Sequence, residues 1–209
     1  MDKEKAIRII NQLENHYPDS KCSLNFSNPA QLLVATILSA QCTDKQVNKV
    51  TPRLFEKYST VEALATAELD DIKKIIRPTG FYNNKAKAIK KSMTSLLEKF
   101  KGRVPDNLDE LIKLDGVGRK TANVVLGDAF GIPGIVVDTH VKRISNRLGI
   151  TKKDDPKKIE QELMKLIPPE RWTLFGHMTI DHGRKICKAR KPDCEHCFLQ
   201  QECQYYNKS

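Results

Sequence analysis

Apolar residues recur at three- and four-residue intervals along most of this 209-residue sequence. That spacing places them on one face of a helix, whereas a half-buried strand requires strict alternation. Asn28 is typical of a helix cap, because a first-turn proline and the apolar run Leu32–Leu38 follow it. Only Ile135–Val137 resembles a strand, and it is too short to build a sheet. The sequence therefore predicts an all-α fold of roughly ten short helices.

The chain is strongly basic, with 36 Lys and Arg residues against 26 Asp and Glu residues and a formal net charge of +10. Such an excess attracts a polyanion, and nucleic acid is the commonest one. On charge alone, a basic protein without such a partner is an equal alternative. No apolar run approaches the ~20 residues of a membrane helix, and no apolar segment follows the charged N-terminus. We therefore expect a cytoplasmic protein with no membrane contact.

Four of the six cysteines lie within the last 23 residues, with the spacing Cys187-x6-Cys194-x2-Cys197-x5-Cys203. Clustered cysteines in a chain expected in the reducing cytoplasm indicate a metal site rather than disulfides. Structural zinc sites usually use two tight cysteine pairs, whereas here one tight pair stands between two more distant cysteines. This spacing favours a 4Fe–4S cluster. Zinc, or four packed cysteines without a metal, remain the alternatives.

Basic residues crowd the same segment, with Lys188, Arg190 and Lys191 between the first two cysteines. A loop held at both ends by a metal site could bind phosphate groups rigidly. The alternative is a solvated loop whose cations balance the negative charge of a cluster.

A glycine-containing turn joins two helical patterns within Leu114-Asp115-Gly116-Val117-Gly118-Arg119-Lys120-Thr121-Ala122. We expect the first helix near residues 108–113, with Asn107 as its cap, and the second through Leu126. Gly116 and Gly118 allow backbone amides to approach a phosphate, and the second helix adds the positive end of its dipole. The segment predicts a hairpin that binds the DNA backbone, although a glycine pair between helices is also an ordinary turn.

Lys120 and Asp138 are the candidate catalytic pair. Lys120 would lie in the first turn of the second hairpin helix, and a neutral lysine amine can form a Schiff base with a sugar carbon. Asp138 precedes the helical pattern of residues 141–148, where an aspartate commonly caps a helix. A carboxylate close to Lys120 could also stabilise positive charge on a departing sugar or deprotonate the nucleophile. A surface lysine and a simple cap are the alternatives.

Together these segments resemble the endonuclease III family of helix–hairpin–helix DNA glycosylases. The resemblance rests on residues 114–125, on Val137-Asp138-Thr139-His140 and on the spaced cysteines, and it covers nearly the whole chain. It implies a discontinuous helical domain of residues 1–20 and 134–209, which carries the cluster. It implies a second, helical-barrel domain of residues 21–133, which contains the hairpin. The metal site would be one 4Fe–4S cluster bound by Cys187, Cys194, Cys197 and Cys203.

The resemblance also implies an activity, that of a bifunctional base-excision repair enzyme. Its substrates would be oxidised or ring-saturated pyrimidines and abasic sites in double-stranded DNA, with the damaged nucleotide flipped out of the helix. Lys120 would attack C1′, displace the base and cleave 3′ to the site by β-elimination through a Schiff base. Asp138 would be the essential carboxylate. We expect a monomer associated with the nucleoid.

Further DNA contacts follow from the same resemblance. Gln41, in Leu38-Ser39-Ala40-Gln41, matches the glutamine that fills the gap left in the helix. Phe81, in Gly80-Phe81-Tyr82-Asn83, matches an apolar wedge for which leucine is familiar. Asp115 replaces a common proline and adds negative charge to the hairpin. The expected DNA-binding set is completed by Gly116, Val117, Gly118, Arg119, Lys188, Arg190 and Lys191.

Two rival functions fit part of this pattern. The related adenine glycosylases share the hairpin, the aspartate and the cluster, but they lack a lysine at the position of Lys120. The second rival is a non-catalytic DNA-binding module with a structural metal. Such a module would not require the Lys120 and Asp138 pair.

Overall fold

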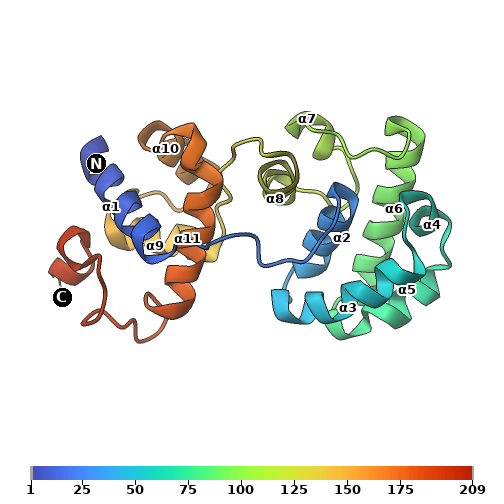
Figure 1. Cartoon of the computed structure of the whole chain (residues 1–209), viewed down its shortest axis with the longest axis horizontal. Helices are drawn as coiled ribbons and strands as arrows, with labels where there is room; N and C mark the ends of the chain where they lie inside the picture. The colour runs from blue at the N-terminus through green and yellow to red at the C-terminus, as the bar shows by residue number, and fades with distance from the viewer. Residues whose placement is uncertain (1, 209) are drawn as a thin grey trace. The chain divides into compact units, whose positions relative to one another are not determined.

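The computed structural model describes residues 2–208, in which all regular secondary structure is helical (Figure 1). Its α-helices, in chain order, are α1 (Lys3–His16), α2 (Pro29–Ser39), α3 (Asp44–Lys57), α4 (Val61–Thr66), α5 (Leu69–Ile76), α6 (Tyr82–Phe100), α7 (Leu108–Leu111), α8 (Arg119–Phe130), α9 (Thr139–Leu148), α10 (Pro156–Leu166) and α11 (Trp172–Lys185). Short 3-10 helices are η1 (Arg77–Thr79), η2 (Pro169–Arg171), η3 (Gln200–Glu202) and η4 (Tyr206–Lys208). The all-α prediction is confirmed.

The chain divides into two compact units, each with its own hydrophobic core. One unit is continuous and comprises Cys22–Ile132, and we call it the hairpin unit. The other combines the residues up to Lys21 with those from Pro133 onward, and we call it the cysteine-loop unit because it contains the four clustered cysteines.

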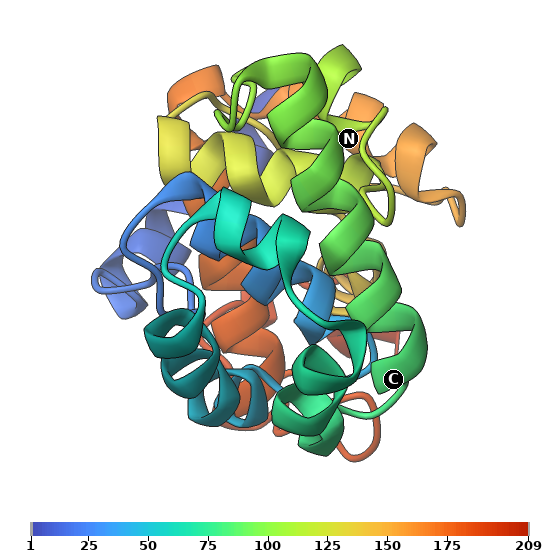
Figure 2. The ribbon, with the colours of Figure 1, turned by 90° about the vertical axis from the view of Figure 1, so that its right-hand side faces the viewer.

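The hairpin unit is built around α2. The seven consecutive residues Leu32–Leu38 of this helix are all buried, so the helix is covered on every side. An apolar surface that extends all round a helix is typical of a central position in the core. Figure 2, in which this unit faces the viewer, shows α2 in the middle and the long α6 along one side. The ends of α2 and α6 therefore emerge from a rigid core.

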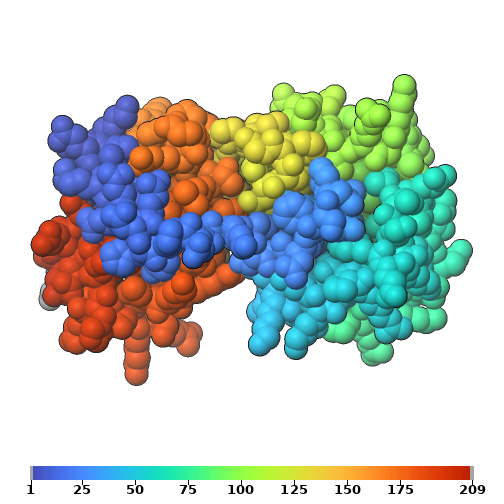
Figure 3. Space-filling view, viewed as in Figure 1, coloured from blue at the N-terminus to red at the C-terminus, as the bar shows by residue number. Residues whose placement is uncertain are grey.

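The cysteine-loop unit packs α1, α9, α10 and α11 around a second core that contains Phe175 and Met178. Its C-terminal segment lies against α1, as the red and blue surfaces in Figure 3 show. Arg8 of α1 forms an ion pair with Glu202 at 2.8 Å, and the rings of His16 and Phe198 stack. These contacts attach the chain that follows α11 to α1.

Helix starts were predicted well, but two short helices were missed. Asn28 caps α2 through its side chain, as the sequence indicates, and Asp155 caps α10 in the same way. Helices α4 and α5 have six and eight residues, which is too short for apolar spacing to distinguish them from loops. The strand-like run Ile135–Val137 belongs to no helix or strand in the described part of the structure, and Ile135 is buried in the core.

None of the helices formed by residues 2–208 combines the length and the apolar character needed to cross a membrane.

Candidate functional site

The hairpin connects α7 to α8 through residues 112–118. The side chain of Asn107 accepts a hydrogen bond from the backbone N–H of Glu110 at 2.9 Å and so caps α7, as expected. Helix α7 ends at Leu111, two residues earlier than the sequence suggests. The N–H of Leu114 bonds to the carbonyl of Leu111, three residues back, which turns the chain and buries Leu114 and Val117. Burial of these two side chains explains the early end of the helix.

Gly116 is required at the apex of this turn. Its φ of +76° lies in the left-handed region, and a Cβ added there would stand 2.7 Å from the Cβ of Ala88 in α6. The hairpin therefore packs directly on α6, and Ser92 of α6 donates a hydrogen bond to the carbonyl of Asp115. Gly118 differs, because its φ is −88° and a Cβ there would meet no neighbouring atom within 4 Å.

The N-terminus of α8 is suited to binding an anion. Gly118 is its N-cap residue and provides no side-chain cap, so the first turn directs backbone N–H groups and the positive end of the dipole away from the helix. Lys120 lies in that first turn, and its side chain is exposed. The amine of Lys120 and a helix end suited to an anion thus occupy adjacent positions.

Asp138 belongs to the cysteine-loop unit and caps α9. Its Oδ1 accepts hydrogen bonds from the backbone N–H groups of His140 and Val141, each at 2.8 Å. Both capping bonds use the same oxygen, so Oδ2 takes no part in the cap. The residue is only partly buried. Its capping role therefore does not occupy the whole carboxylate.

Gln41 and Phe81 both stand immediately beside helix ends in the hairpin unit. Gln41 follows the end of α2 with a φ of 53°, and Phe81 is the N-cap residue of α6 with a φ of 48°. Both are non-glycine residues in the left-handed region, which is uncommon. Phe81 is 61% exposed, more than the other large apolar side chains among the described residues. Two exposed side chains are thus held in unusual backbone conformations.

The four clustered cysteines line one common pocket. The walls also contain His182 and Arg147, and His182 Nε2 lies 3.7 Å from the Sγ of Cys197. Four sulfur donors around a common space fit an iron–sulfur cluster, which is ligated by thiolates. Within residues 2–208, no three Cys, His, Asp or Glu side chains converge closely enough to hold a single metal ion.

Two arginines that sequence reasoning missed hold the cysteine loop. Arg147 donates to the Sγ of Cys187 at 3.3 Å and to the carbonyl of Lys188 at 2.8 Å, and Arg143 donates to the carbonyl of Cys187 at 2.9 Å. The two arginines are four residues apart on α9, so they share one face of the helix. That spacing was visible in the sequence, but their targets lie about 40 residues further along the chain.

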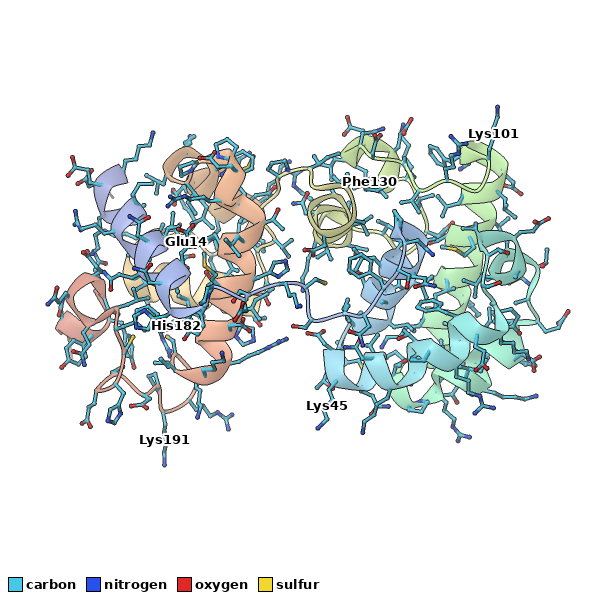
Figure 4. All side chains as sticks on the ribbon, viewed as in Figure 1. Glu14, Lys45, Lys101, Phe130, His182 and Lys191 are labelled. Atoms are coloured by element: carbon cyan, nitrogen blue, oxygen red, sulfur yellow. The ribbon has the colours of Figure 1, made fainter. Side chains whose placement is uncertain are left out.

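The loop cations point outward. Lys188, Arg190 and Lys191 are all exposed, and Figure 4 shows the side chain of Lys191 extending away from the protein. Lys191 has a φ of 50°, a further left-handed non-glycine residue. Since Arg147 also donates to the carbonyl of Ala189 at 3.1 Å, the loop backbone is fixed while its cations face solvent.

The predicted site residues fall into two groups. The hairpin unit contains Gln41, Phe81, Gly116, Val117, Gly118, Arg119 and Lys120. The cysteine-loop unit contains Asp138, Lys188, Arg190, Lys191, Cys187, Cys194, Cys197 and Cys203. In each unit these residues gather at helix ends or in the loop that follows α11.

Comparison with known proteins gives a consistent answer over the whole chain. Residues 34–169 match the HhH-GPD superfamily of base excision DNA repair proteins, and residues 187–203 match the iron–sulfur binding domain of endonuclease III. The chain is 53% identical to the endonuclease III of Synechocystis sp. over 202 residues, covering 96% of this chain and 92% of the relative.

Two solved structures superpose closely on this one. They are a non-covalent endonuclease III–DNA complex and a trapped covalent endonuclease III–DNA intermediate. Each is 46% identical to this chain, with a TM-score of 0.95, and the match covers 100% of this chain and 98% of the other.

The two hairpin glycines should respond differently to replacement by alanine. Gly116→Ala combines a strained φ with a clash against Ala88, and we expect it to lower the free energy of unfolding by about 1–3 kcal/mol. Gly118→Ala meets neither obstacle and should change it by less than about 1 kcal/mol. Thermal and urea unfolding followed by circular dichroism measure both values. Equal stability of the two variants would contradict the packing of the hairpin on α6.

Proposed function

We propose residue roles on the premise that this chain belongs to the endonuclease III family of base-excision repair enzymes. It is a DNA glycosylase and AP lyase that binds DNA and carries a 4Fe–4S cluster. The proposal assigns the chemistry to particular side chains and names the lesion class. The exposed position of Lys120 beside the anion-binding end of α8 is the single observation that carries it.

Lys120 is the nucleophile in this proposal. Its neutral Nζ attacks C1′ of the damaged nucleotide, and the base departs with the electrons of the glycosidic bond. Loss of the amine protons and opening of the sugar ring give an imine between Nζ and C1′. Removal of a proton from C2′ then expels the 3′ phosphate, which is β-elimination. Hydrolysis of the imine returns the free amine.

Asp138 supplies the negative charge in this scheme. Positive charge develops on the sugar as the base leaves, and a carboxylate stabilises it or takes the proton from the attacking amine. Two capping bonds at Oδ1 fix the orientation of the carboxylate, and Oδ2 remains for the chemistry. The cap of α9 is therefore also the support of the catalytic group.

The substrates we propose are oxidised or ring-saturated pyrimidines and abasic sites in double-stranded DNA. The hairpin from Gly116 to Arg119 and the cations Lys188, Arg190 and Lys191 would hold phosphates, while Gln41 and Phe81 would enter the duplex. The protein would act as a monomer, in the cytoplasm and associated with the nucleoid. The two units would correspond to a cluster-carrying domain and a helical-barrel domain.

Cys187, Cys194, Cys197 and Cys203 would ligate the cluster, and their common pocket supports this assignment. The bound cluster cross-links the loop by four thiolate bonds. The chain's own contribution is the pair of α9 arginines, which fix the loop backbone at Cys187, Lys188 and Ala189. The loop is thereby a rigid platform for its exposed cations.

Lys120→Gln should form no covalent adduct with DNA under borohydride reduction, because glutamine has no nucleophilic amine. It should still bind duplex, since the backbone amides of the hairpin are unchanged. The assay uses an oligonucleotide with one thymine glycol, followed by denaturing electrophoresis. Lys113→Gln, which alters an exposed lysine of the hairpin connection outside the predicted DNA-binding set, should form the adduct normally. A strong adduct from the Lys120 variant would refute the assignment.

Asp138→Asn should reduce single-turnover base release by about 10²-fold or more, the loss expected when a positioned acid–base or electrostatic group is removed. The fold should survive, because asparagine caps a helix as well as aspartate does. Asp155→Asn is a matched control, since Asp155 caps α10 by the same kind of bond. Near-normal base release by the Asp138 variant would mean that Asp138 acts only as the helix cap of α9.

Lys191→Ala should weaken binding equally on damaged and undamaged duplex and lower the salt slope of log K by about one unit, as expected for one lost phosphate contact. Base release at saturating enzyme should stay unchanged. Lys165→Ala removes the same charge from an exposed position of α10 and should leave the salt slope unaltered. An unchanged slope in both variants would mean that Lys191 is solvated surface.

A further inference from the structure

We propose that Lys85 is a positioning residue, whose buried ammonium group ties the Gln41 loop to the Phe81 loop so that both enter DNA as one rigid element. The inference rests on the proposed function, which assigns DNA entry to Gln41 and Phe81. It adds a residue that touches neither DNA nor the reacting atoms. It also explains how two exposed loops, about 40 residues apart in sequence, keep a fixed relation.

Lys85 is the only buried lysine among those whose side chains the structure describes, with 5% of its surface exposed. Its Nζ donates one hydrogen bond to the carbonyl of Leu38 and another to the carbonyl of Thr79, both at 2.8 Å. Leu38 lies three residues before Gln41, and Thr79 lies two residues before Phe81. One cation thus holds the base of each loop.

The Leu38 carbonyl belongs to the last turn of α2, where carbonyls lack partners within the helix and the dipole is negative. A cation at this position satisfies an orphan acceptor and interacts favourably with the dipole. The Thr79 carbonyl ends η1, immediately before the glycine that precedes Phe81. The backbone N–H of Lys85 makes the ordinary helical bond to the carbonyl of the N-cap residue Phe81 at 3.1 Å, so this lysine lies in the first turn beside the Phe81 loop.

Both loops contain conformations that need support. Gln41 and Phe81 have positive φ values without being glycine, and no side chain caps α6 at Phe81. Such conformations persist only when surrounding contacts over-determine them. The two carbonyl contacts of Lys85 lie within three residues of each strained position, on the side that leads into it.

Burial of the ammonium group is costly, and it lowers the pKa of Lys85. An apolar side chain of similar length would fill the same volume without that cost. It could not donate hydrogen bonds to the two carbonyls, which would then lose their partner. The two hydrogen bonds to the loops therefore explain why a charged group is buried here, and packing alone does not.

The test separates loop positioning from catalysis and from general stability. Lys85→Met removes the donors and keeps the length of the side chain. Lys90→Met is the matched control, because Lys90 lies on the same helix and its Nζ donates to the carbonyl of Ala67 at 2.8 Å, outside both loops. Lys85→Gln, which retains an N–H donor, serves as a second variant if Lys85→Met folds poorly.

Each variant is measured on two substrates under single-turnover conditions. A duplex with thymine glycol requires entry of the loops, whereas an abasic site in a single strand has no stacked pair to open. We expect Lys85→Met to slow base release from duplex by about tenfold or more, as for a displaced positioning group. Cleavage of the single strand should stay within about twofold of the parent rate, as should both rates of Lys90→Met. Lys85→Gln should lie between the parent and Lys85→Met on duplex.

A spectroscopic measurement reports the same step without catalysis. 2-Aminopurine opposite an uncleavable abasic analogue brightens when it is unstacked, so the parent protein at saturation should increase its fluorescence. Lys85→Met should give a smaller increase at saturation, and Lys90→Met the full one. Gln41→Ala and Phe81→Ala are measured in parallel.

The outcomes distinguish this inference from the proposed function. If Gln41→Ala and Phe81→Ala slow the duplex reaction but Lys85→Met and Lys85→Gln do not, the inference on Lys85 is wrong and the loop assignment stands. If the two loop variants behave as the parent, the assignment of DNA entry is wrong, and the role of Lys85 fails with it. Equal losses of Lys85→Met on both substrates would show a structural effect and would also overturn the inference.

Discussion

The first four N–H groups and the last four C=O groups of an α-helix have no partner within the helix. This chain places its functional positions where that constraint acts. Lys120 occupies the first turn of α8, and Asp138 is the cap of α9. Gln41 follows the last turn of α2, and Phe81 precedes the first turn of α6. Helix interiors supply the rigid cores, and helix ends supply directed polar groups beside accessible side chains.

The unpaired backbone groups at the ends of these helices find partners in different ways, and the difference matters for function. Asp138 fills the start of α9 with its own carboxylate, so a catalytic candidate is oriented by the cap that it makes. Gly118 leaves the start of α8 without a side-chain cap, which suits an incoming phosphate. At the end of α2 the local N–H groups of Ala40 and Cys42 bond to the carbonyls of Ile37 and Ser39, and a cation from another helix, Lys85, bonds to the carbonyl of Leu38 between them. A long-range contact there joins two loops that local capping would leave independent.

Features governed by near neighbours could be predicted from the sequence. Asn28 and Asn107 are caps whose partners lie three residues on, and each makes the expected bond. The hairpin and the cysteine spacing could likewise be predicted from local sequence patterns. Short helices without a full apolar repeat, such as α4, could not be predicted in this way.

Contacts between distant parts of the chain were also beyond local patterns. The sequence shows Lys85 as one lysine among many, and nothing near it marks the carbonyls of Leu38 and Thr79 as its partners. The same holds for Arg147, whose bonds reach Cys187 and Lys188 only after α9 and the cysteine loop have folded together. Tertiary packing decides these contacts, and they determine how the functional loops are held.

The two departures from the family pattern can be judged from their surroundings. Asp115 adds an anion to the hairpin that we propose binds phosphate, but Lys91 of α6 lies 3.8 Å from its carboxylate and offsets part of that charge. Both side chains are more than half exposed, so the pair contributes little to stability, on the order of 0–1 kcal/mol. The backbone carbonyl of Asp115 is separately fixed by Ser92, so the turn does not depend on a proline.

Phe81 keeps a large apolar surface in solvent at a position where its backbone is strained. Packing in the free protein does not offset that unfavourable free energy, since the ring is mostly exposed. Stacking of the ring against bases in bound DNA would offset it, and such aromatic contacts are tolerant of sequence. A phenyl ring is flatter than a leucine side chain, so stacking on a neighbouring base becomes available in addition to wedging. The exchange therefore alters how the duplex would be held open while leaving the loop geometry, set through Leu38 and Thr79, unchanged.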